Sequence, residues 1–174
     1  EPEPEPEPTT FTYSNGDIST SIETMITSGS YTVPPRTALT NVKIGPNVTS
    51  IGDNAFYGAS DLISVTFGAN SQLTSLELAT FYGASSLTSI TIPEGVTIIG
   101  SSVFQGATAL TSITIPEGVI SIGGYAFYGA ASLTSVTFEE NSQLISIGNT
   151  AFHTASSLTS ITIPEGVTSI GSAA

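Results

Sequence analysis

The chain has 174 residues, and its 14 acidic side chains against 2 basic ones give a formal net charge of −12. A nucleic-acid surface needs clustered cations to displace the counterions of the phosphates, so this composition excludes that class and disfavours anionic membranes. The chain has no cysteine, which excludes a disulfide framework and a thiolate metal site. No run of about 20 apolar residues is present, so we expect no membrane insertion.

Residues 1–8 alternate Glu and Pro. Alternating proline favours an extended polyproline II conformation, so this segment is predicted to be a stiff tail. Whether it serves as a linker or as a docking strand stays open.

Residues 9–36 do not match the repeat that follows, and we expect them to cap its N-terminal end. Phe11 and Tyr13 alternate with threonines, which predicts a strand. Residues 14–17 (Ser-Asn-Gly-Asp) are a turn signal. The spacing of Ile18, Ile22, Met25 and Ile26 predicts one face of a helix, with a strand pair as the alternative because the segment is rich in Ser and Thr.

From residue 37 to residue 174 the sequence repeats itself. The six copies are 37–59, 60–84, 85–107, 108–130, 131–155 and 156–174, and their lengths are 23 or 25 residues except for the last, which has 19. A period in this range indicates a solenoid, in which no coil can bury its apolar edge without its neighbours. We refer to the copies as coils one to six.

The third copy illustrates the role expected of each position. Ile90 and Ile92 share one face of a short strand, which Pro93 ends because proline has no backbone donor. Val96 and Ile99 return to the interior on a second extended segment. Stacking of the coils then predicts an internal phenylalanine column of Phe56, Phe81, Phe104, Phe127 and Phe152, and a second column of Ile44, Phe67, Ile92, Ile115, Phe138 and Ile163.

Coils two and five replace the Pro-Glu-Gly corner with a loop that is two residues longer, at residues 68–72 and 139–143. We expect these loops to bulge at one edge. They either form a recognition edge or reflect neutral variation in length.

The motifs Leu-Thr-Ser-Ile-Thr-Ile-Pro-Glu-Gly-Val, Ile-Gly and Ala-Phe-x-Gly resemble the BspA-like (Treponema-type) leucine-rich repeats. The resemblance implies a leucine-rich-repeat solenoid rich in β-structure, with parallel strands, a short second strand and a helical or 3-10 turn in each of about six coils of 23–25 residues. It also implies that partners bind the concave face. Where the family often has Cys, this chain always has Ala, at Ala59, Ala84, Ala107, Ala130 and Ala155.

The outward side chains of the first strand are mainly hydroxyls, and we call these residues the Ser/Thr face. They are Ser64, Thr66, Ser89, Thr91, Ser112, Thr114, Ser135, Thr137, Ser160 and Thr162, preceded by Asn41 and Lys43 in the first coil. Such a ladder can bind a protein or a glycan. It also resembles the threonine arrays of ice-binding solenoids, so ice or mineral binding is a further alternative, while a merely solvated strand face is the simplest interpretation.

Other candidate chemistry is sparse. Glu94, Glu117 and Glu165 recur at the corners and could recruit Ca²⁺, but the chain lacks an Asp-rich loop, so we expect solvated carboxylates. The single histidine, His153, supports neither a metal site nor a catalytic triad. We therefore expect no enzyme, no metal and no cofactor. Asn47 begins the one Asn-Val-Thr glycosylation acceptor.

The sequence also predicts an open end. Ala174 occupies the position of Ala126, one residue before the phenylalanine of the column, so the last coil is expected to be unclosed around Ile170. Either the array continues, or another copy closes the coil through Phe11 and Tyr13. We therefore expect an extracellular or cell-surface structural or adhesive protein that assembles head-to-tail, with a monomeric recognition module as the alternative.

Overall fold

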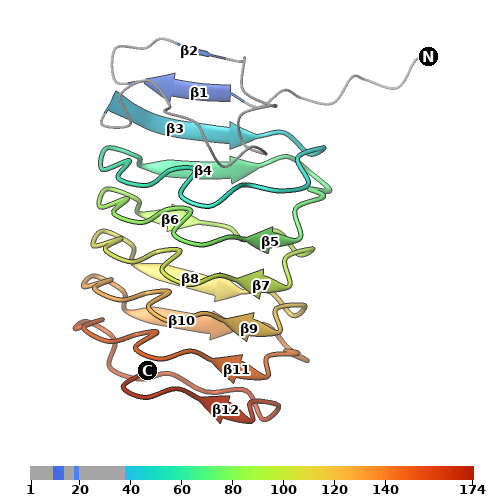
Figure 1. Cartoon of the computed structure of the whole chain (residues 1–174), viewed down its shortest axis with the longest axis vertical. Helices are drawn as coiled ribbons and strands as arrows, with labels where there is room; N and C mark the ends of the chain where they lie inside the picture. The colour runs from blue at the N-terminus through green and yellow to red at the C-terminus, as the bar shows by residue number, and fades with distance from the viewer. Residues whose placement is uncertain (1–9, 14–17, 20–37) are drawn as a thin grey trace.

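The computed structural model describes residues 10–13, 18–19 and 38–174, and it shows a parallel β-solenoid. Each coil contributes to one or both of two rows of strands (Figure 1). The first row contains β3 (Leu39–Ile44), β4 (Ser64–Phe67), β6 (Ser89–Ile90), β8 (Ser112–Ile115) and β10 (Ser135–Phe138). The second row contains β5 (Ser75–Leu76), β7 (Ile98–Ile99), β9 (Ser121–Ile122), β11 (Ser146–Ile147) and β12 (Ser169–Ile170). The predicted solenoid and its short second strand are confirmed.

The register keeps equivalent residues on top of one another. In the first row Ile44 pairs with Phe67, and Ile115 pairs with Phe138. In the second row the strands from β5 to β12 form one continuous parallel sheet. Each copy of the repeat therefore advances each sheet by one strand.

Two N-terminal strands extend the first row, and the one next to it runs in the opposite direction. β1 (Thr10–Tyr13) lies between β2 (Ile18–Ser19) and β3, antiparallel to both. The strand predicted at Phe11 and Tyr13 is confirmed. The helix prediction is wrong at Ile18–Ser19, where the alternative strand pair is present, because β2 supplies hydrogen bonds to the otherwise unpaired edge of β1. The tail at residues 1–8, the turn at 14–17 and the remaining helix positions lie outside the described residues.

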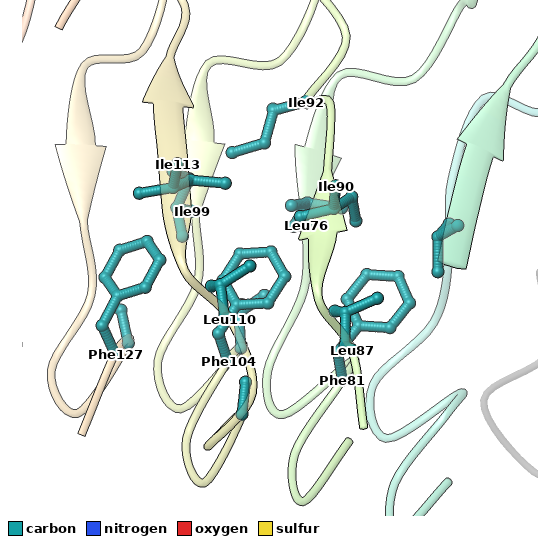
Figure 2. Close-up of a cluster of buried hydrophobic side chains, with 14 of the residues drawn as sticks. Leu76, Phe81, Leu87, Ile90, Ile92, Ile99, Phe104, Leu110, Ile113 and Phe127 are labelled. Atoms are coloured by element: carbon teal, nitrogen blue, oxygen red, sulfur yellow. The ribbon is translucent and has the colours of Figure 1, made fainter. Parts of the chain in front are cut away.

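The phenylalanine column occupies the interior of the solenoid. Successive ring centroids from Phe56 to Phe152 are 5.2, 5.7, 5.3 and 5.1 Å apart, and the rings are stacked. Figure 2 shows Phe81, Phe104 and Phe127 side by side, with the leucines and isoleucines of their coils around them. The predicted single internal column is confirmed.

The second column is buried at the isoleucines that have a strand or coil on both sides. Ile44, Ile92 and Ile115 are buried, whereas Phe67 and Phe138 are half-buried. The alanines in the position where the family often has Cys are buried, as expected for a small interior slot.

The segments that carry the phenylalanines are turns, and they contain no helical or 3-10 turn of the kind expected in each coil. A residue with positive φ, such as Ser102 at 58°, interrupts each of these segments. Alternate N–H groups then bond to the next coil: Phe104 N donates to Ala126 O at 2.8 Å, and Gly106 N donates to Tyr128 O at 2.8 Å. These bonds between coils replace the bonds that a helix would make within one coil.

At the bend after the second strand of the third coil, the coils approach too closely for a side chain at Gly100. A Cβ added at Gly100 would lie 2.7 Å from Leu76 O in the coil before it. Glycine is favoured at Gly106 for a different reason, because the φ of 76° there is left-handed.

Candidate functional site

The Ser/Thr face forms the ordered ladder that the sequence predicts. Ser64 pairs with Ser89, Ser112 with Ser135, and Thr114 with Thr137. All members of the face are exposed except Ser64, which is half-buried and whose hydroxyl donates to Asn41 Oδ1 at 2.7 Å. Ser160 and Thr162 lie outside any strand, so the ladder is less regular in the sixth coil.

Other hydroxyl columns in the chain are used to join the coils. Thr134 Oγ1 donates to Thr111 O at 3.0 Å, and Thr108 Oγ1 donates to Ser85 O at 3.2 Å. In contrast, the hydroxyls of Thr114 and Thr137 have no hydrogen-bond partner within the described part of the chain. Their donors and acceptors point outward and can meet a ligand or water.

The remaining candidate residues are dispersed over the surface. Glu94, Glu117 and Glu165 are exposed at their corners, and His153 is exposed with its ring 5.6 Å from that of Tyr128. In the described ranges, no three His, Asp or Glu residues come together in a way that could hold a metal ion. Asn47 is exposed, so its side chain is sterically accessible.

The two ends of the solenoid differ in how they are covered by the rest of the chain. At the first end, β1 is paired on both sides within its own chain, so Phe11 and Tyr13 lie on an inner strand and β2 forms the edge among the described strands. At the other end, Ile170 is 57% exposed and Ala174 is exposed. A hollow of about 240 Å³ there is lined by apolar side chains, among them Phe152, Leu158 and Ile163.

The hollows beneath the two long loops are a feature that the sequence indicates only in part. The long loops of coils two and five were predicted to bulge, but the hollows beneath them were not predicted. The signal that could have revealed them is the mismatch in length between each long loop and the shorter corner of the following coil.

Comparisons with known proteins agree with this geometry. A family model described as "BspA type Leucine rich repeat region (6 copies)" matches residues 10–77, 24–146 and 74–174. No curated protein matches the chain. In the part of the chain that the structure describes, no helix is both long enough and apolar enough to cross a membrane.

Solved structures with the same fold come from bacteria. A leucine rich cell surface protein from Faecalibacterium prausnitzii is 37% identical with a TM-score of 0.66, over 77% of this chain and 35% of that protein. The T. pallidum Leucine Rich Repeat protein is 25% identical with a TM-score of 0.59, over 83% of this chain and 62% of that protein. A leucine-rich repeat protein from Eubacterium ventriosum, at 23% identity and a TM-score of 0.55, shares the fold.

The chain thus spans about a third of the first of these proteins and somewhat less than two thirds of the second. The family model, by comparison, extends over the strands at the N-terminus and all six coils. The chain belongs to the BspA-type leucine-rich-repeat family.

Proposed function

We propose that this chain is an extracellular structural or adhesive repeat protein of a cell surface, in which the solenoid is a rigid building block rather than an enzyme. The family, the resemblance to a protein described as a cell surface protein, and a surface of uncharged Ser and Thr support this proposal.

The observation that carries a structural role is the apolar end of the sixth coil. Leu158, Ile161 and Val167 are half-buried there, whereas their equivalents in the inner coils are buried. Burying these side chains needs another coil stacked on this end, supplied either by further sequence or by a second copy. In the proposed assembly a second copy provides it, with the β2 edge rather than β1 as the strand available at its N-terminal end.

Sizing of the 174-residue polypeptide by light scattering tests this assembly. We expect the average mass to rise with concentration, and Ile170→Ser to weaken the association because it removes apolar surface from the end. Ile98→Ser is the matched control, since Ile98 is 47% exposed but lies on the wall of the solenoid. A mass that stays monomeric at every concentration, or an equal loss with Ile98→Ser, would contradict assembly through this end.

A second candidate function is recognition of a protein or glycan by the Ser/Thr face. The outward hydroxyls of Thr114 and Thr137, which lack a partner within the described residues, favour it. Binding to arrays of matrix proteins and glycans tests this candidate, with Thr114→Arg and Thr137→Arg combined to block the face. Unchanged binding by that variant would place recognition elsewhere on the chain.

A further inference from the structure

Two hollows of the same construction open along one edge of the solenoid. The first, of about 310 Å³, is lined by Phe67, Asn70, Ser71, Thr91, Pro93 and Glu94. The second, of about 530 Å³, is lined by Phe138, Asn141, Ser142, Thr162, Pro164 and Glu165. Each residue of the second set follows its counterpart in the first by three coils, so the chain contains two hollows of similar lining. They differ in that Glu139 lines the second where Gly68 lines the first.

A mismatch in loop length creates each hollow. The loop between Phe67 and Leu73 is two residues longer than the corner between Ile92 and Val96, which stacks on it. Leu73 and Val96 are both fully buried, so the two segments start and finish at the same level of the core. The extra residues must therefore project beyond the shorter corner, and they leave a space beside the aromatic ring.

The walls of the hollows are held in place before any ligand binds. Gln72 N donates to Pro46 O at 2.9 Å, and at the second loop Gln143 N donates to Glu117 O at 2.9 Å. The loops also share their backbone conformation, with φ of 58° at Asn70 and 59° at Asn141. A preformed site of this kind loses little conformational entropy on binding.

The side chains of the hollows combine one partly uncovered ring with neutral polar groups. Phe67 and Phe138 are half-buried, in a column where the inner isoleucines are buried. Asn70 and Asn141 are exposed, and their amides can both donate and accept hydrogen bonds. Glu94 and Glu165 are exposed and can only accept.

This chemistry suits a sugar ring better than the other ligand classes. The apolar face of a pyranose can lie on an aromatic ring while its hydroxyls bond to amide, hydroxyl and carboxylate groups at the rim. The carboxylates and the net charge of −12 oppose an anionic ligand. A calcium ion would need more oxygen ligands than the single carboxylate of the first hollow, or the two of the second (Glu139 and Glu165), provide with their neutral neighbours.

We propose that the two hollows are paired binding sites for a neutral polysaccharide. They lie three rungs apart, which is ~14 Å for parallel strands. A polymer long enough to reach both gains affinity from the second contact, on the order of 100-fold or more. These sites use the edge of the solenoid and so do not depend on the end-to-end assembly proposed above.

Affinity electrophoresis tests the proposal, in gels that each contain one neutral polysaccharide: a β-glucan, starch, mannan, xylan or galactan. At least one of these is expected to retard the chain, while the acidic polymer polygalacturonate does not. The variant with both Phe67→Ile and Phe138→Ile is expected to migrate as in a plain gel. Isoleucine fills the same position at Ile92 and Ile115, so this change removes the ring and keeps the fold, which circular dichroism verifies.

The single variants separate the two sites. Phe67→Ile or Phe138→Ile alone is expected to weaken binding of the polysaccharide on the order of 100-fold. For a short oligosaccharide of the same sugar, calorimetry is expected to give two sites per chain in the wild type and one in each single variant, with an unchanged Kd. Phe152→Ile, which changes a half-buried ring outside the hollows, should leave binding unaltered. So should Ile170→Ser, which separates this proposal from the assembly.

Several results would overturn the proposal. They are the failure of every neutral polysaccharide to retard the chain, full binding by the double variant, a preference for polygalacturonate, or a single oligosaccharide site in the wild type.

Discussion

The fourth and sixth coils contain the same ten residues, Leu-Thr-Ser-Ile-Thr-Ile-Pro-Glu-Gly-Val, yet they differ in structure. In the fourth coil this stretch forms β8 and Ile115 is fully buried. In the sixth coil the equivalent residues 160–163 form no strand, and Ile163 is half-buried. Because the local sequence is identical, the difference comes from the neighbours: the fourth coil has a coil on both sides, and within the described chain the sixth has one on a single side. Stability in this solenoid is therefore a property of pairs of coils.

The largest expected effect is on the free energy of unfolding, and it should differ between the middle and the end of the phenylalanine column. Phe104→Ala should lower the free energy of unfolding by about 3–5 kcal/mol, because it leaves a cavity between two stacked rings. Phe152→Ala should cost less, about 1–2 kcal/mol, because that ring is half-buried and stacks on Phe127 alone. Urea unfolding followed by circular dichroism measures both values. Equal losses would show that the end coil is as well packed as the middle.

The second effect concerns the close approach of backbones between coils. A Cβ at Gly123 would lie 2.5 Å from Ser101 N, so Gly123→Ala should destabilise the chain by about 1–3 kcal/mol. Gly171→Ala, at the same position of the sixth coil, should cost less because that coil can shift. Gly118→Ala is the control, since its nearest atom would be 3.4 Å away, and it should change stability by less than about 0.5 kcal/mol. Melting temperatures of the three variants would rank these costs.

A third substitution should stabilise the chain at the junction of the last two coils. Thr154 has a φ of 60° at the position where the first four coils have a glycine with positive φ. A β-branched residue is strained in this region, so Thr154→Gly should raise the free energy of unfolding by about 1 kcal/mol. The reverse change at an inner coil, Gly106→Thr, should lower it by about 1–3 kcal/mol. A destabilised Thr154→Gly protein in the same urea titration would refute this account of strain.

The smallest effect is expected on the Ser/Thr face. Thr114→Ala and Thr162→Ala should each change stability by less than about 0.5 kcal/mol, because both side chains are exposed. Thermal unfolding of the two variants checks this expectation in the middle coil and in the end coil. If Thr114→Ala lowered the free energy of unfolding by more than about 1 kcal/mol, the ladder would stabilise the fold and not only be available to bind a ligand.

Much of the fold follows from the spacing of particular residues. In each of the first five copies a phenylalanine lies three residues before an alanine of the same register, as Phe104 lies before Ala107. This spacing predicts the internal column, because in-register stacking places these rings together in the interior. The Pro-Glu-Gly corners and the alternating isoleucines likewise locate both strands of the third and fourth coils. The order of the Ser/Thr face follows from the same register, since residues two apart on a strand share a side.

Other features depend on groups brought from elsewhere in the chain. Ile18 lies in a strand because β1 offers an edge, although its spacing also suits a helix face. The turns around Ser102 and Tyr125 replace the expected helical turns because the coil that follows supplies carbonyls for their N–H groups. The hollows beside Phe67 and Phe138 exist only because a longer loop meets a shorter corner. The repeat by itself determined which residues stack, whereas the tertiary structure decided where backbone groups find partners and where space is left, because both depend on the neighbouring coil.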